Sequence, residues 1–320
     1  MSARSRSAAM PSRKKLVKGF VPISLVEIPS NGLAGLMYYI KERESIRLKK
    51  EAGKSKPWTA DEILQQYKFT NVKRAHDRTT QDFVLFYRKH KNQWYADDGV
   101  LLYNCGVSRY FGTFNFRLAV GWLNTYAPKH LIAVARELKK RGEQVFTGAY
   151  IITSAGQSRP KEETVAEYLG GLWRARSAII KAMRTSHRWE DGYQHLTKLP
   201  GFGGSGFMAK EVLQDFLLMS KMQIDDAETW TPMGPGARRG MNRLLGRDKW
   251  FKQPEEMFID EVQQVHSILA PWWKKTYPKA EALTAHDVQF CLCEFDKYER
   301  TRLGDGRPKT TYDGTKDHHP

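Results

Sequence analysis

Apolar residues recur at helical spacing along most of the chain. Between residues 36 and 50 they include Leu36, Tyr39, Ile40 and Leu48, and Gly53 follows as a stop signal. The same spacing predicts further helices over 79–90, 114–126, 129–141, 161–184, 209–220, 238–245, 254–274 and 284–302. The sequence therefore predicts a mainly α-helical fold.

A helix-start pattern follows this first segment. Thr59 and Glu62 have the spacing of a capping box, in which each side chain bonds the other residue's free backbone N–H group. Ile63, Leu64 and Tyr67 would then form the apolar face of this helix. We expect a short helix that begins at Thr59.

One short segment, 145–153, has the β-branched and aromatic character of a strand, and Gly142 and Gly156 bound it. We place a linker at 148–159, between two helical lobes. The expected organisation is a flexible basic arm over 1–19, an N-terminal helical lobe over 20–147, a C-terminal helical lobe over 148–303 that carries the glycine motifs, and an irregular tail over 304–320.

Basic residues exceed acidic ones by a wide margin. The chain has 52 Lys and Arg against 35 Asp and Glu, a formal charge of +17. A field of this sign attracts polyanions such as nucleic acid or an acidic membrane surface. Nucleic acid fits best, because basic residues stand beside aromatic ones at 173–176 and 249–252. Simple solubility is the alternative interpretation.

The chain carries no signal for a membrane span or for export. Its apolar runs are shorter than the roughly 20 residues that cross a bilayer. The basic arm lacks the apolar stretch of a secretory signal, although an organellar transit peptide has a similar composition. Cys105, Cys291 and Cys293 suit neither a disulfide framework nor a zinc or four-cysteine iron–sulfur site. We expect a cytoplasmic protein with no membrane partner.

Glycines cluster between helical stretches, in the run L-P-G-F-G-G-S-G that starts at Leu199. Glycine lets the backbone approach a phosphate closely, and the N–H groups at the start of the next helix favour an anion. We therefore expect Gly201, Gly203 and Gly204 to contact DNA phosphates, together with Lys210. An ordinary glycine turn is the alternative, and the pattern of a Walker phosphate loop is absent.

A second glycine turn, at Gly234, opens into a strongly basic helix. Arg238, Arg239 and Arg243 lie near its start, and guanidinium groups bind phosphate oxygens in pairs. This arrangement suits a clamp for a di- or triphosphate. The alternative is a solvated basic face against the DNA backbone, which Asn242 would join.

The C-E-F-D-K-Y segment from Cys293 places charged residues beside aromatic ones. Glu294 and Lys297 are three residues apart, and that spacing alone predicts a surface ion pair worth a few tenths of a kcal/mol. Asp296 lies between them, and Arg307 follows in a G-D-G-R-P-K run. We take Lys297 and Arg307 as candidate DNA contacts.

Polar residues also cluster after Tyr67. Asn71, Arg74, Asp77 and Arg78 stand three and four positions apart, so one helix surface would hold them together. Asp77 either orients an arginine or caps the helix that follows. We expect the amide and the two arginines of this cluster to contact DNA.

Five segments in a fixed order carry a family resemblance. They are I-K-E-R-E-x-I-R-L-K-K-E-A-G from Ile40, Y-K-F-T-N-V from Tyr67, L-P-G-F-G from Leu199, G-P-G-A-R-R-G from Gly234 and C-E-F-D-K-Y from Cys293. Together they resemble the phage α-glutamyl/putrescinyl thymine pyrophosphorylases, or amino acid:DNA transferases, and the related helical domain of 5-hydroxymethyluracil DNA kinases. The resemblance implies a two-lobed helical fold like that of the helix-hairpin-helix DNA glycosylases.

The resemblance also implies a reaction on DNA that contains 5-pyrophosphoryloxymethyl-deoxyuridine. An amino acid or polyamine replaces pyrophosphate, which requires a polycationic pocket for the leaving group and an acceptor for the proton of the amine. For the first role we expect Arg238, Arg239 and Arg243. For the second we expect Asp215, with Asp296 or Glu294 as alternates. Arg47, in the stretch from Ile40, joins the expected DNA contacts.

Two departures limit what the resemblance implies. The hairpin lysine of bifunctional glycosylases would fall at Ser205 or Phe207, and neither Asp225 nor Asp226 has the usual context of a glycosylase aspartate. The hairpin therefore supports the fold more than base excision. Because a kinase needs a phosphate loop, a non-catalytic DNA-binding module associated with such a kinase is the alternative. No compact carboxylate cluster indicates a metal site, and a role for Mg²⁺ stays open.

Overall fold

The computed structural model describes residues 28–89, 97–147, 152, 158–308 and 310–312, and over these residues it is helical with no strand. The mainly α-helical prediction is confirmed. The helices in chain order are α1 (Ser30–Glu51), α2 (Glu62–Gln66), the 3₁₀ turn η2 (Arg74–His76), α3 (Arg78–Arg88), α5 (Asp98–Phe111), α6 (Phe114–Val120), α7 (Pro128–Lys140), α8 (Lys161–Ser186), α9 (Trp189–Leu196), α10 (Phe207–Met219), α11 (Pro235–Leu244), α12 (Glu255–Thr276) and α13 (Ala285–Arg302).

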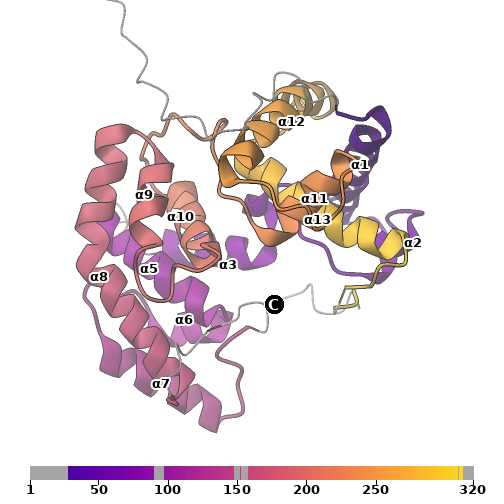
Figure 1. The fold of residues 1–320 in the computed structure, drawn as a ribbon. Coiled ribbons are helices and arrows are strands. Elements are labelled where there is room, and N and C mark those ends of the chain that lie inside the picture. Colours follow the sequence, from indigo (N-terminus) through magenta and orange to yellow (C-terminus); the bar gives the residue numbers. More distant parts are fainter. Residues whose placement is uncertain (1–27, 90–96, 148–151, 153–157, 309, 313–320) are drawn as a thin grey trace, which may run out of the picture.

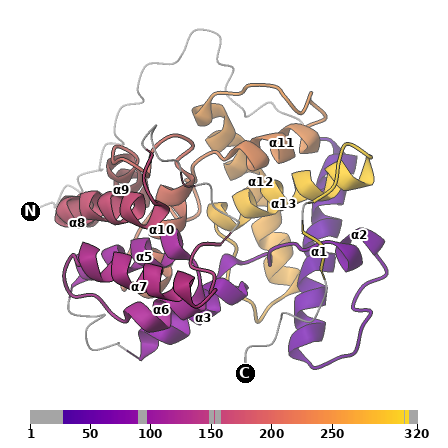
Figure 2. The same ribbon diagram turned by 90° about the horizontal axis from the view of Figure 1, so that it is seen from below.

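Two hydrophobic clusters divide these helices into two lobes (Figures 1 and 2). The central lobe comprises α3 and α5 to α10, and residues such as Phe111 and Phe216 fill its core. The terminal lobe comprises α1, α2 and α11 to α13, with Leu36 and Trp273 in its core. Each cluster therefore draws residues from both sides of position 148, where the sequence pattern placed the division between lobes.

The terminal lobe joins the first helix of the chain to the last ones. Helix α13 packs against both α11 and α1, and the two views show α1 beside α13 (Figures 1 and 2). Gly240 permits the close crossing of α11 and α13, because a Cβ atom there would lie 1.9 Å from the Leu292 carbonyl oxygen. Long-range packing of this kind leaves no local sequence pattern.

Helix α5 is the main element that the sequence pattern did not predict. Every residue from Gly99 to Phe111 is buried, including the polar residues Asn104 and Arg109. A helix buried on all sides has no polar face, so its sequence shows no helical period. Only the start of α5 has a recognisable sequence feature, a capping aspartate. The Asp97 carboxylate accepts the N–H groups of residues 99 and 100.

Several local predictions need correction. The cap of α2 is Asp61, whose carboxylate accepts the Leu64 N–H group, so the capping box expected at Thr59 is wrong. A true capping box starts α13, between Thr284 and Asp287. Helix α6 is shorter than expected, since it ends at Val120 and Gly121 is its C-cap, and α9 was not predicted. The strand candidate 145–153 and the linker lie partly outside the described residues, and the basic arm wholly so.

Candidate nucleic-acid-binding site

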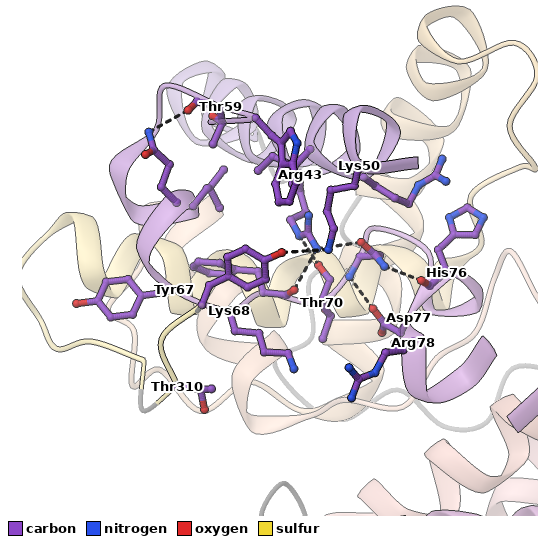
Figure 3. Close-up of a pocket in the computed structure, with 18 of the residues that line it drawn as sticks. Arg43, Lys50, Thr59, Tyr67, Lys68, Thr70, His76, Asp77, Arg78 and Thr310 are labelled. Atoms are coloured by element: carbon purple, nitrogen blue, oxygen red, sulfur yellow. Dashed lines mark hydrogen bonds between the residues drawn. The ribbon is translucent and has the colours of Figure 1, made fainter. Parts of the chain in front are cut away.

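A large basic cavity lies against the terminal lobe, lined by α1, the segment 56–81, the end of α13 and the tail residues Pro308, Thr310 and Tyr312 (Figure 3). Its volume is about 810 Å³, which is within the range of small-molecule pockets. Among the described lining residues two are acidic, Glu51 and Asp77. Nine are basic: Arg43, Arg47, Lys50, Lys56, Lys68, Arg74, Arg78, Lys297 and Arg300. The cavity therefore suits an anion.

Hydrogen bonds shape the wall of the cavity between residues 69 and 77. The guanidinium group of Arg43 donates to the carbonyl oxygen of Thr70 at 2.9 Å and to the side-chain oxygen of Asn71 at 2.9 Å. The Asp77 carboxylate accepts the Asn71 N–H group at 2.8 Å and an Arg74 N–H group at 2.9 Å. Asp77 orients an arginine and makes no side-chain cap on α3, so the first of its two expected roles is the one observed.

Two aromatic rings and two ammonium groups form another part of the wall. The Lys50 and Lys56 ammonium groups each lie 5.0 to 5.4 Å from the ring centroids of Trp58 and Tyr312. The tail is held there by backbone bonds, since the N–H group of Tyr312 donates to the Gln66 carbonyl oxygen at 2.8 Å. The tail, which the sequence analysis treated as irregular, thus completes the cavity.

His76 is the histidine of this cavity. Burial lowers the pKa of its imidazole, and the nearby charge of Arg47 lowers the pKa further, so the ring is uncharged near neutral pH. Its Nδ1 atom is buried and has no hydrogen-bond partner. A neutral imidazole has one nitrogen that accepts a hydrogen bond, while the surrounding cations disfavour its protonation.

The structure brings several predicted DNA contacts together in this one cavity. Lys50, Lys68 and Arg78 point into it from three segments of the chain (Figure 3). Arg307 is exposed and precedes Pro308, which lines the cavity. The predicted contacts that line it are Arg47, Asn71, Arg74, Arg78 and Lys297.

The glycine hairpin joins α9 to α10 in the central lobe. Gly201 has a φ of +86°, its carbonyl oxygen accepts the Tyr110 hydroxyl at 2.6 Å, and a Cβ atom there would lie 2.3 Å from the Tyr168 ring. Gly204 also has a positive φ but faces open space. The expected contact Lys210 is buried, with its ammonium group 3.2 Å from the Gln289 side-chain oxygen. In this conformation Lys210 is out of reach of DNA.

A buried ion network connects α10 to the cavity. The Glu211 carboxylate accepts from Arg74 at 2.7 Å and lies 3.4 Å from Arg109. Burial would raise the pKa of Glu211, but the charges of Arg74, Arg109 and Lys210 lower it to about 2. Asp215, the expected proton acceptor, is 1% exposed and binds Arg109 through both oxygens at 2.5 Å. This carboxylate supports the fold and does not face the cavity.

The arginines of α11 are paired with carboxylates. Asp296 accepts from Arg239 at 2.8 Å and from Arg243 at 3.0 Å, and Arg243 also bonds Asp305 at 3.0 Å. The clamp expected here is therefore largely neutralised, and Asp296 is occupied. Asn242 is fully buried and donates to carbonyl oxygens of the loop that follows, so it does not reach DNA in this conformation. Arg238 is half-buried, and its Nε atom has no partner.

Sequence reasoning missed part of the cavity. Arg43 and Lys50 stand one turn on either side of Arg47, so a basic stripe along α1 was visible. Lys56 and Tyr312 meet only because the tail returns to α2, and no spacing rule indicates that contact. Glu294, the other alternate proton acceptor, accepts from Lys297 at 2.8 Å and from the Thr70 N–H group at 3.0 Å.

No group of three or more His, Cys, Asp or Glu side chains among the described residues is arranged to hold a metal ion. No helix in the described part of the chain is both long and apolar enough to cross a bilayer.

The structure is thus a two-lobed helical protein with a cavity whose charged lining residues are mainly cations. The family model for the helical domain of 5-hmdU DNA kinases matches residues 30–307, and the chain belongs to this family. A 5-hmdU DNA kinase of Bacillus phage SP10 is 28% identical over 229 residues, which cover 65% of this chain. The chain spans 36% of the length of that relative. No solved structure matches the chain.

Proposed function

We propose that the protein modifies thymine-derived bases in DNA and that the basic cavity holds the modified nucleotide. The family description and the name of the phage relative both refer to a kinase of 5-hmdU DNA. The observation that carries the proposal is the set of nine cations around about 810 Å³, of which Arg47, Arg74 and Lys297 form ion pairs with carboxylates. A base that bears a pyrophosphate is highly anionic, and guanidinium and ammonium groups stabilise both that base and its departing pyrophosphate.

The base must leave the DNA stack to enter such a cavity. Trp58 and Tyr312 offer ring faces on which an extruded base can stack. Lys68 and Arg78 are exposed at the cavity, where they can hold the flanking phosphates. The hairpin glycines Gly201, Gly203 and Gly204 are the further candidates for contacts with the DNA backbone.

The reaction we propose is a substitution at the methylene carbon on C5 of 5-pyrophosphoryloxymethyl-deoxyuridine. The nitrogen of an amino acid or polyamine forms a bond to this carbon, the carbon–oxygen bond breaks, and pyrophosphate leaves with the electron pair. The new ammonium group then loses one proton to an acceptor. Cations around the leaving group lower the barrier because they stabilise charge that develops in the transition state.

The acceptor that the geometry favours is His76. Asp215 does not face the cavity, and the carboxylates of Asp215, Asp296 and Glu294 are each occupied by ion pairs with arginine or lysine. His76 lines the cavity and its imidazole is neutral near pH 7.

Mass spectrometry of nucleosides tests the proposal. DNA that contains the pyrophosphorylated base is incubated with the protein and a panel of amino acids and polyamines. We expect an aminated thymine and free pyrophosphate. Replacing both Lys68 and Arg78 with alanine should lower the single-turnover rate by about 100-fold. Lys140→Ala, which removes an exposed cation from α7, should leave the rate unchanged. Full activity of the double variant would remove the cavity from the reaction.

The arginines of α11 are the competing pyrophosphate site. Arg238→Ala separates the two, since it should spare the single-turnover rate at saturating DNA if the cavity holds the leaving group. A loss of two to three orders of magnitude would instead place the departing charge at α11.

A non-catalytic DNA-binding module is the second candidate function. The family description names one domain of a kinase, and this sequence has no Walker phosphate loop. This candidate predicts tight, salt-dependent DNA binding with no new nucleoside for any amine in the panel.

A further inference from the structure

An exposed aromatic pair stands on the loop that joins α11 to α12. Trp250 is 60% exposed and Phe251 is 43% exposed. In the described part of the chain, this is the one place where two large exposed apolar side chains are adjacent in sequence. Single exposed apolar residues are ordinary on protein surfaces, but two neighbouring rings form a patch that a partner can cover.

Hydrogen bonds from buried and neighbouring residues fix the loop that carries these rings. Asn242, which is fully buried, donates its side-chain N–H groups to the carbonyl oxygens of Lys249 at 3.4 Å and Phe251 at 3.0 Å. The Asp248 carboxylate accepts the Trp250 N–H group at 2.7 Å, and its carbonyl oxygen accepts the Phe251 N–H group at 2.9 Å. The rings are thus presented in a fixed position, which lowers the entropy lost on binding.

Cations surround both rings. The guanidinium group of Arg239 lies 5.9 Å and the Lys249 ammonium group 6.0 Å from the Trp250 ring centroid, and Arg247 lies 5.5 Å from the Phe251 ring. Each of these cations also pairs with a carboxylate: Asp296 for Arg239, Asp305 for Lys249 and Glu261 for Arg247. Lys252 is exposed beside them. The Lys249 ammonium group also bonds Asp305 at 2.7 Å, in the tail that continues past Arg307 to the cavity. The patch and the cavity are therefore linked through the tail.

We propose that Trp250 and Phe251 form a second DNA-binding site, on which unpaired bases stack while the exposed Lys252 faces a phosphate. The proposal rests on the proposed function only in taking DNA as the partner. Nucleobases have flat ring faces and phosphates on either side, and aromatic residues flanked by Lys and Arg match that combination without reading sequence. A protein partner would need apolar area without a requirement for the cations.

Fluorescence anisotropy with labelled oligonucleotides tests this site. The variant carries Trp250→Ala and Phe251→Ala, and the control is Leu85→Ala, which removes an equally exposed apolar side chain from α3. We expect the Kd for single-stranded DNA to rise about fivefold to 100-fold in the variant and to stay unchanged in the control. Because stacking releases no counterions, the slope of log Kd against log salt should not change, whereas Lys252→Ala should reduce it.

An unchanged Kd for the double variant would overturn the proposal. Conversion of the wild-type protein from dimer to monomer by the same substitutions, with DNA affinity intact, would also overturn it, because the patch would then be an interface between copies. Trp250→Phe should recover most of the affinity. All these measurements use unmodified DNA, so their outcome is independent of the nucleoside assay that tests the proposed function.

Discussion

Replacing Asp215 with asparagine separates a structural role from a catalytic one. In the structure both carboxylate oxygens accept from Arg109 at 2.5 Å, and neither residue is more than 3% exposed. The amide cannot accept through both atoms, and its NH₂ group faces other donors. The guanidinium group would then stay buried without its full counter-charge, so the folded state should lose stability.

The size of this loss follows from the surroundings of Arg109. Removing one partner of a buried ion pair costs about 3–5 kcal/mol. Arg109 keeps a longer contact with Glu211, at 3.4 Å, so we expect the lower value, about 3 kcal/mol. A chain of 320 residues has an unfolding entropy of about 0.7 kcal/mol/K, which converts the loss into a Tm decrease of roughly 4–5 °C.

Differential scanning calorimetry at neutral pH measures this decrease, and Asp225→Asn, at an exposed carboxylate, is the matched control. The double variant Arg109→Met with Asp215→Leu should recover part of the stability, because it removes both buried charges. A Tm equal to that of the wild type, together with loss of nucleoside modification, would refute the structural role and return Asp215 to the active site.

Three further predictions follow from the same structure. Lys68→Ala should lower the slope of log Kd against log salt by about 1 for duplex DNA, whereas Lys140→Ala should leave it unchanged in the same titration. Glu211→Gln should lower the free energy of unfolding by its full amount above pH 4.5 and by progressively less as the pH falls toward 2. The reason is that the wild-type carboxylate has a pKa of about 2 in the folded state, so the stability that it contributes is lost as the pH falls toward that value. Urea unfolding midpoints measured from pH 5 to pH 3 show the trend. Gly201→Ala should cost about 2–4 kcal/mol, since it combines a positive φ with a contact 2.3 Å from the Tyr168 ring, while Gly204→Ala, with its open surroundings, should cost about 1 kcal/mol; equal thermal shifts would contradict the steric argument.

The sequence predicted those helices that have one apolar and one polar face. Helices such as α7 and α12 begin and end within two residues of the predicted ranges, because their exposed sides are polar. The sequence pattern failed to predict α5, where Arg109 and Asn104 are buried and hydrogen-bonded inside the core. Polar residues in this helix therefore do not indicate an exposed face. Burial of a polar residue also explains why nothing in the sequence indicates that Asp215 is enclosed in the core. The family resemblance led us to expect a proton acceptor at Asp215, whereas its contact with Arg109 indicates a structural role.

The candidate site shows why the density of basic residues along a sequence is a weak guide to where an anion binds. Helix α11 is as basic as α1, yet Asp296 and Asp305 neutralise Arg239 and Arg243 from more than 50 positions away. In the cavity nine cations come from α1, the segment 56–81 and the end of α13. Arg47, Arg74 and Lys297 among them are paired with carboxylates, of which Glu51 and Asp77 line the cavity and Glu211 lies behind Arg74. What an anion experiences is the charge left after such pairing, and pairing is decided by tertiary contacts. For this reason the α1 stripe and the segment after Tyr67, rather than the arginine-rich α11, form the stronger candidate for binding a pyrophosphorylated base.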